Sequence, residues 1–167
     1  MKTKRILLIA ALIFWMGLIF YFSSQNAELS DETSGRAVGL FRKLFFPDWE
    51  TLPQDEYLYQ MHALTFFVRK LAHFTEYLIL GILLSAVLMT FRKTWKFRFL
   101  TAVGAGILYA LSDEFHQMFV AGRAMMFFDV LTDSAGVFFG TVLILGLSAA
   151  VMLSRREEQD PGAGGSA

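Results

Sequence analysis

The sequence contains no cysteine, so neither disulfide bonds nor thiolate metal ligands contribute to its fold or function. Charged residues are also scarce: they make up 18% of the 167 residues, whereas about a quarter is usual in soluble domains. No long basic patch is interleaved with aromatic residues in a polar context, which argues against nucleic-acid binding. Hydrophobic residues make up 55% of the chain and include 18 phenylalanines. These proportions predict an integral membrane protein with one domain.

Four stretches without a charged residue predict four transmembrane helices. The first, Ile6 to Phe22, holds 17 residues and the last, Ser134 to Ser154, holds 21. The middle two, Tyr77 to Phe91 and Phe99 to Ser112, hold 15 and 14 residues, fewer than the roughly 20 that cross a bilayer. Both must therefore draw polar neighbours into the membrane or its boundary. We predict an all-α integral membrane protein with four transmembrane helices. The predicted spans are residues 6–24, 71–91, 98–118 and 130–153.

The two ends of the chain differ in character. The first apolar stretch follows a short basic start, as a signal-peptide core also does, but no small-x-small cleavage motif occurs in residues 23–27. We therefore favour a helix that stays in the protein. Residues 160–167 are rich in Pro, Gly and Ser, which is typical of disorder. We predict a membrane domain over residues 1–154 and a disordered cytoplasmic tail over residues 155–167.

Charge asymmetry predicts the orientation. With both termini in the cytoplasm, the inner segments carry nine of the 15 basic residues but only three of the 15 acidic residues. The short basic loop at residues 92–98 is the kind of segment that the positive-inside rule weighs most. We therefore predict a multi-pass protein of the bacterial plasma membrane with both termini cytoplasmic.

The polar connection between the first two spans carries its own helical pattern. Hydrophobic residues recur there at helical spacing, at Val38, Phe41, Leu44 and Phe45. Basic residues such as Arg42 lie off that stripe. The pattern predicts an extracytoplasmic amphipathic helix that lies on the membrane surface.

The predicted topology places polar residues of different spans together at the outer face. Arg69, His73 and Glu76 stand at i, i+4 and i+7, so they share one helical face. Asp113 and His116, at i and i+3, share a face of the next span. An ionised side chain that faces lipid at a helix centre costs about 2.5–3.5 kcal/mol, so these faces turn toward the bundle interior. We expect His73 and His116 to share one water-accessible hollow.

These clusters define the candidate site. The candidate catalytic residues are His73, Glu76, Asp113 and His116. The candidate ligand-binding residues are Ser24, Gln25, Arg69, Lys70, Tyr77, Glu114, Gln117, Arg123, Asp129 and Asp133. Purely structural roles stay open, because the basic members also suit anchoring at lipid headgroups and the acidic members suit salt bridges between helices. His62 has no partner at useful spacing and we interpret it as incidental.

Three kinds of function are compatible with such a site. In the first, an outer pocket binds a lipid-linked cell-wall molecule or another amphiphile, and Arg69, Lys70 and Arg123 hold its phosphate or carboxylate. The second is a membrane-embedded hydrolase or transferase in which His73 or His116 acts as the general base. A metal-assisted version would need the four candidate catalytic residues as ligands, but no HExxH signature is present, and we predict no metal and no cofactor. The third is a transporter or proton relay, for which four short spans would have to oligomerise.

The ordered set of these motifs resembles the VanZ-like family of small bacterial membrane proteins. The matching segments are Phe22 to Gln25, Arg69 to Tyr77 with Leu80-Gly81, Ser112 to Gln117, Gly122-Arg123, and Asp129 to Gly136. One departure is Ala121, where the family often has proline before Gly-Arg. The resemblance implies a multi-span protein of the bacterial cell envelope, in a family named for a member linked to resistance against the lipoglycopeptide teicoplanin. It implies no particular biochemical activity.

Overall fold

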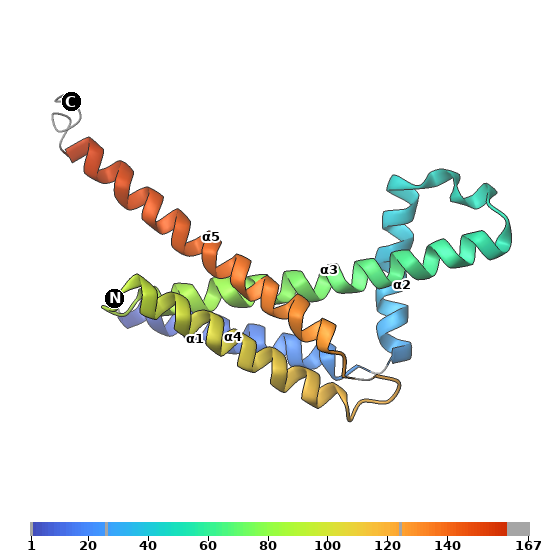
Figure 1. Ribbon diagram of the computed structural model, residues 1–167, viewed down its shortest axis with the longest axis horizontal. Helices are drawn as coiled ribbons and strands as arrows, with labels where there is room; N and C mark the ends of the chain where they lie inside the picture. Colours follow the sequence, from blue (N-terminus) through green and yellow to red (C-terminus); the bar gives the residue numbers. More distant parts are fainter. Residues whose placement is uncertain (1, 26, 124, 160–167) are drawn as a thin grey trace.

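The computed structural model describes residues 2–25, 27–123 and 125–159, and over this part of the chain every regular element is a helix. The elements are α1 (Lys2–Ser23), α2 (Ala27–Phe45), the 3-10 helix η1 (Pro47–Thr51), α3 (Gln54–Met89), α4 (Trp95–Gln117) and α5 (Phe127–Gln159). Figure 1 shows α1, α3 and α4 running lengthwise together with the first half of α5, whereas α2 crosses α3 beyond the ends of the others. The predicted all-α class is confirmed.

Three of the described helices, α1, α3 and α5, are long and apolar enough to cross a membrane. With 23 residues, α4 is about as long as α1, but it carries Lys96 and Arg98 near its start and Asp113 and Glu114 near its end. α4 is not among the helices that are apolar enough to span by this measure. It packs between them nonetheless, against both α3 and α5. The protein is therefore a helical membrane protein in which α4 belongs to the same bundle as the three apolar helices.

The longest helix, α3, is continuous over 36 residues, whereas the sequence predicts a span only from residue 71. At about 1.5 Å per residue it measures roughly 54 Å, against a hydrocarbon core of about 30 Å. Its first part therefore extends beyond the other helices, and α2 packs on this extension (Figure 1).

α2 buries only part of the predicted apolar stripe. Val38 of the stripe is 0% exposed, and Arg42, which the pattern places off the stripe, is 6% exposed. The burial of Arg42 differs from the prediction and goes with the packing of α2 against α3. Leu44 and Phe45 of the stripe lie exposed on the surface of the protein. The position of α2 on the membrane surface stays a prediction.

Close contact between α3 and α5 depends on glycine. A Cβ atom at Gly136 would stand 2.4 Å from the carbonyl oxygen of Phe74, and one at Gly140 would stand 2.0 Å from that of Leu78. Both distances are far inside van der Waals contact, so only glycine allows the two backbones to approach this closely. At Gly104, by contrast, a Cβ would meet no atom within 4 Å.

Side-chain hydrogen bonds to backbone carbonyls attach α1 to its neighbours. Trp15 Nε1 donates to the carbonyl oxygen of Glu76 at 2.9 Å. The Tyr109 hydroxyl on α4 donates to the carbonyl oxygen of Met16 at 2.7 Å. These bonds flank the buried hydrophobic core, which consists of Ile19, Tyr77, Leu80, Ala110 and Val137.

The last helix extends further than the sequence predicts. α5 continues to Gln159, past the end of the predicted span and past the predicted start of the tail at residue 155. Residues 160–167 of the predicted tail lie outside the described residues. Figure 1 shows the second half of α5 diverging from the other helices.

We expect Gly140→Ala to destabilise the bundle by about 1–3 kcal/mol, because the added methyl group overlaps a backbone carbonyl that cannot move independently. Gly104→Ala is the matched control. It should be neutral or stabilising by up to about 1 kcal/mol, because alanine is the better helix former. Melting temperatures of the two purified variants in detergent measure the difference. Equal melting temperatures would contradict a glycine-dependent contact between α3 and α5.

Candidate functional site

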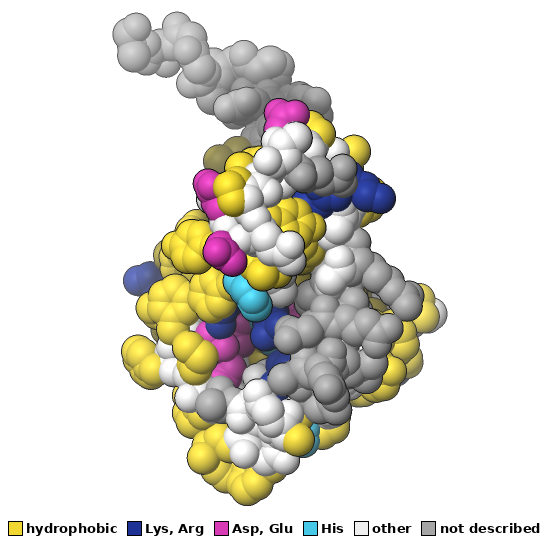
Figure 2. All heavy atoms as spheres, turned by 90° about the vertical axis from the view of Figure 1, so that its right-hand side faces the viewer, with side chains coloured by type: hydrophobic (Ala, Val, Ile, Leu, Met, Phe, Trp, Pro, Cys, Tyr) yellow, Lys and Arg dark blue, Asp and Glu magenta, His cyan; other side chains and the backbone are white. Residues whose placement is uncertain are grey.

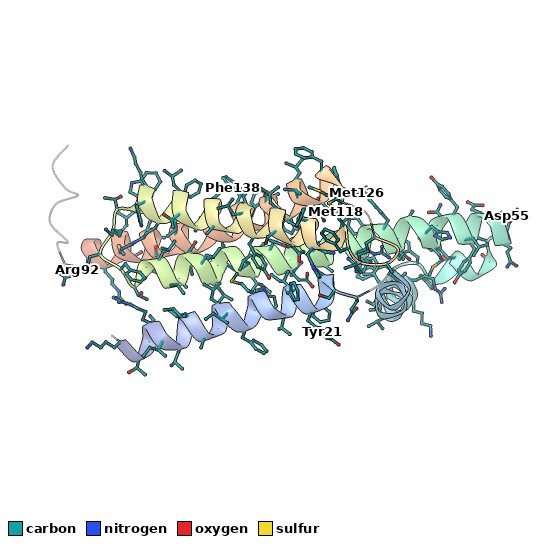
Figure 3. The ribbon with its side chains drawn as sticks, turned by 90° about the horizontal axis from the view of Figure 1, so that it is seen from below. Tyr21, Asp55, Arg92, Met118, Met126 and Phe138 are labelled. Atoms are coloured by element: carbon teal, nitrogen blue, oxygen red, sulfur yellow. The ribbon has the colours of Figure 1, made fainter. Side chains whose placement is uncertain are left out.

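One end of the bundle collects the polar side chains of four helices. We call it the polar end; it consists of Ser23–Gln25, Arg69–Tyr77, Asp113–Arg123 and Asp129–Asp133. In Figure 3, Tyr21, Met118 and Met126 mark this end, and Arg92 lies at the opposite end. The chain reverses direction in the loop between α3 and α4 and again between α4 and α5. Segments almost a hundred residues apart thus become neighbours.

A buried carboxylate on α4 joins three of these segments. Asp113 is 3% exposed, and its Oδ2 accepts a hydrogen bond from Ser23 Oγ of α1 at 2.7 Å. Gln117 Nε2 lies 3.3 Å from Ser23 Oγ and 3.4 Å from the same carboxylate oxygen. The Tyr77 hydroxyl of α3 also faces Asp113. A buried carboxylate is costly unless polar groups satisfy it, so these contacts hold α1, α3 and α4 together at this end.

Beside this cluster lies a cavity of about 300 Å³. Its lining residues are Phe66, Arg69, Lys70, His73, Gln117, Gly122, Arg123, Met126 and Asp129. Figure 2 views the molecule from this side, where dark blue and magenta side chains are recessed between yellow ones. Three lining residues are basic and one is acidic, so the cavity presents mainly positive charge. We call it the polar-end cavity.

Two pairs of ionisable side chains connect α3 to α5. Lys70 Nζ forms a salt bridge with Asp129 Oδ1. His73 Nδ1 lies 3.9 Å from Oδ1 of Asp133, whose side chain is buried. The carboxylate that faces His73 is therefore Asp133, from another helix, and not Glu76 from the next turn of its own helix. His73 borders the cavity while Asp133 stands behind it.

Arg123 reaches the cavity from the loop between α4 and α5. Gly122 has a positive φ of 75°, which glycine adopts without strain, and this turn directs the following residue. The turn forms although position 121 holds alanine, where the VanZ-like family often has proline. Arg123 Nη1 donates to Gln117 Oε1 at 3.3 Å. Burial and the nearby Arg69 lower the pKa of the Arg123 guanidinium, whereas the nearby Asp113, Glu114 and Glu76 act in the opposite direction.

The loop is held in place by a buried acid. Glu114 is 0% exposed, and its Oε2 accepts a hydrogen bond from the backbone N–H of Met126 at 3.1 Å. Glu114 thus contacts the chain just before α5 and does not line the cavity. Its position keeps the loop folded back onto the bundle, where Arg123 and Met126 form one wall of the cavity.

The two histidines do not share a hollow as expected. His73 lines the polar-end cavity, whereas His116 lies on the side of α4 that faces α1. There His116 Nε2 is 3.1 Å from Ser24 Oγ, and its ring stacks on Phe20 at a centroid distance of 4.5 Å. The spacing of His116 and Asp113 places them on one helical face, but Gln117 rather than His116 borders the cavity. The expectation is wrong because only one side of α4 faces α3 and α5.

The remaining candidate residues do not line the cavity. Glu76 lies within electrostatic reach of Asp113 and Arg123, and Gln25 is half-buried just after α1. The sequence-based selection missed the apolar wall, namely Phe66 and Met126. The spacing of Phe66, one turn before Lys70 in the same helix, could have indicated that it lies beside the site. In the structure the Lys70 ammonium lies 5.2 Å from the centroid of the Phe66 ring. For Met126, within an apolar loop, the sequence offered no such signal.

The four candidate catalytic residues do not form a metal site in the described part of the chain. There, no group of three or more His, Cys, Asp or Glu side chains is arranged to hold a metal ion. His73 lines the polar-end cavity, whereas His116 faces α1.

The relationship to known proteins agrees with the motifs. The family model described as VanZ/LLP1 matches residues 8–150, which include every segment of the polar end. No curated protein and no solved structure matches the chain. The match covers most of the sequence and confirms the predicted family: this chain belongs to the VanZ/LLP1 family of proteins.

Proposed function

We propose that this protein binds the anionic headgroup of an amphiphile anchored in the outer leaflet of the bacterial plasma membrane. The observation that carries the proposal is the lining of the polar-end cavity, where Arg69, Lys70 and Arg123 converge with one acid, Asp129. Three of the other acids of the polar end, Asp113, Glu114 and Asp133, are buried in the protein. The cavity thus offers positive charge to a ligand, although the polar end as a whole is rich in carboxylates.

Phosphate or carboxylate is the chemistry that this lining favours. Arginine donates paired hydrogen bonds to such groups, and charge-assisted bonds of this kind are stronger than neutral ones. The positive charge of Arg123 is partly buried and lies near another guanidinium. An anion that enters the cavity relieves this repulsion. Gln117, which already bonds Arg123, adds a neutral donor and acceptor for orienting the ligand.

Apolar surface around the cavity suits a ligand that stays anchored in lipid. Phe66 and Met126 form part of the wall. The loop between α4 and α5 and the start of α5 expose large hydrophobic side chains, namely Met118, Phe119, Met125, Phe127 and Phe128. Such a surface is stable within the leaflet and unfavourable in water. The headgroup would enter the cavity sideways while its hydrocarbon chain remains among the lipids.

The proposal includes four transmembrane helices with both termini in the cytoplasm. α4 packs against two helices that are apolar enough to span, and it is of similar length to α1. With α4 as the fourth span, the basic segments at residues 2–5 and 92–98 lie at the cytoplasmic face, as the positive-inside rule favours. The polar end then faces outward, and α2, which crosses α3 beyond that end, lies at headgroup level (Figure 1).

Two ligand classes fit this description. One is a lipid-linked cell-wall precursor, which carries phosphate next to a hydrocarbon chain. The other is a lipoglycopeptide antibiotic such as teicoplanin, because the VanZ-like family is named for a member linked to resistance against that compound. Both are amphiphiles with an anionic group near the membrane surface, so one cavity can serve either.

A membrane-embedded hydrolase or transferase is the second candidate, favoured by the contact between Ser24 Oγ and His116 Nε2. However, Ser24 Oγ also donates to the carbonyl oxygen of Phe20 at 2.7 Å. A hydroxyl has one hydrogen to donate, so His116 is the donor in the other contact and does not act as a base toward Ser24. The arrangement therefore favours binding over nucleophilic catalysis.

Opposite changes of charge in the polar-end cavity should have opposite effects on binding. We expect Arg123→Gln to weaken binding of a polyprenyl diphosphate about tenfold or more, because a charge-assisted hydrogen bond contributes about 1.5–3 kcal/mol. Asp129→Asn removes the acid from the lining and should strengthen binding. Titration of purified protein in nanodiscs measures both affinities, with teicoplanin as a second ligand.

Arg92→Gln is the control, since it makes the same change of charge at an exposed site in the basic loop at the other end. It should bind as the unaltered protein does, and uncharged polyprenol should bind to none of the variants. Unchanged affinity in both cavity variants would overturn the proposed cavity, as would a loss of affinity in Asp129→Asn equal to that in Arg123→Gln.

The absence of cysteine allows a direct test of the four-span topology. Lys93→Cys and Ala121→Cys place single thiols in the exposed loops before and after α4. A membrane-impermeant maleimide added to intact spheroplasts should label position 121 but not position 93, and both after lysis. Labelling of both positions, or of neither, before lysis would show that α4 does not cross the membrane.

A further inference from the structure

A second cavity lies at the end of the bundle opposite to the polar end. We call this end the basic end; it consists of residues 2–5 and 92–98 together with the adjoining turns of α3 and α5. The cavity has a volume of about 460 Å³, within the range of ligand-binding pockets in proteins. It is lined by Lys4, Leu8, Ala86, Met89, Thr90 and Ile144.

The paths of three helices create this cavity. Arg5 of α1 donates from Nε to Thr90 Oγ1 at 3.0 Å and from Nη2 to the Thr90 carbonyl oxygen at 2.9 Å, so α1 is held against the end of α3. The second half of α5 instead diverges from both helices (Figure 1). The space between them is bordered by apolar side chains of all three helices, and it opens toward the surroundings of the bundle. In a membrane those surroundings are lipid.

Charge determines which lipid suits this position. Residues 2–5 and 92–98 include seven basic residues and no acid. Among the basic residues, Arg5 is engaged by Thr90 and lies 4.3 Å from the centre of the Phe91 ring. Lys4 is exposed and is the one charged residue that lines the cavity. The cavity therefore combines an apolar interior with a cationic rim.

We infer that this cavity binds an anionic phospholipid of the adjacent leaflet. One acyl chain lies along Leu8, Ala86, Met89 and Ile144, and the phosphate is held by Lys4 at headgroup level. Long lysine side chains near helix ends extend toward the headgroups, and basic pockets between transmembrane helices bind anionic headgroups. The lipid fills the gap between α5 and the rest of the bundle. This site is separate from the polar-end cavity and does not depend on its function.

Native mass spectrometry of protein extracted from vesicles tests this inference. The vesicles contain equal amounts of phosphatidylglycerol and phosphatidylcholine with identical acyl chains. We expect one retained phosphatidylglycerol per protein, with retention several-fold above that of phosphatidylcholine. Lys4→Gln should abolish this preference, whereas Lys2→Gln, an equal change of charge outside the lining, should preserve it.

A second pair of variants tests the apolar interior. Ile144→Trp fills the cavity and should reduce retention of both lipids severalfold, while Leu143→Trp, on an exposed neighbouring position, should not. Equal retention of the two lipids by the unaltered protein would overturn the inference. The inference would also be overturned if Lys2→Gln lost the preference for phosphatidylglycerol as Lys4→Gln does, or if Leu143→Trp reduced lipid retention as much as Ile144→Trp. A dimer without bound lipid, in which a second copy covers the cavity, would overturn it as well.

Discussion

The register between α3 and α5 is the constraint on which the rest of the structure depends. Both helices run in the same direction from the polar end, and glycine lets their backbones touch where Phe74 meets Gly136 and Leu78 meets Gly140. Continuing that register one turn toward the polar end brings His73 to Asp133 and Lys70 to Asp129. The pairs of ionisable residues are therefore a consequence of helix packing. A shift of one turn would leave buried carboxylates facing apolar side chains or lipid.

The same packing separates the charges by sign. Asp113, Glu114 and Asp133 are buried, and each contacts or faces a group of another segment: a serine of α1, the backbone before α5, or a histidine of α3. These contacts give the carboxylates structural roles and remove them from the cavity surface. The basic side chains at this end are longer, and they extend past the helix contacts to the cavity. A polar end with more acids than bases thus presents a mainly cationic hollow.

Much of the helical framework follows from the sequence, because stretches without charged residues indicate helices buried in a membrane. The meeting of the four polar segments follows from topology alone. The sequence could not show which side of each helix faces the bundle interior at the polar end. For α4, spacing groups Asp113, His116 and Gln117, but packing turns His116 toward α1 and Gln117 toward the cavity. The inward position of Arg42 in α2 likewise depends on a helix contact that no periodicity encodes.

Site-specific photo-crosslinking in intact membranes can show whether an anionic amphiphile occupies the polar-end cavity. Benzoylphenylalanine replaces either Phe66, which lines the cavity, or Phe67, which is equally exposed but does not line it. Irradiation followed by mass spectrometry identifies what is captured. The account predicts a phosphate- or carboxylate-bearing amphiphile attached at position 66 and only bulk phospholipid at position 67. Identical products at both positions would contradict it.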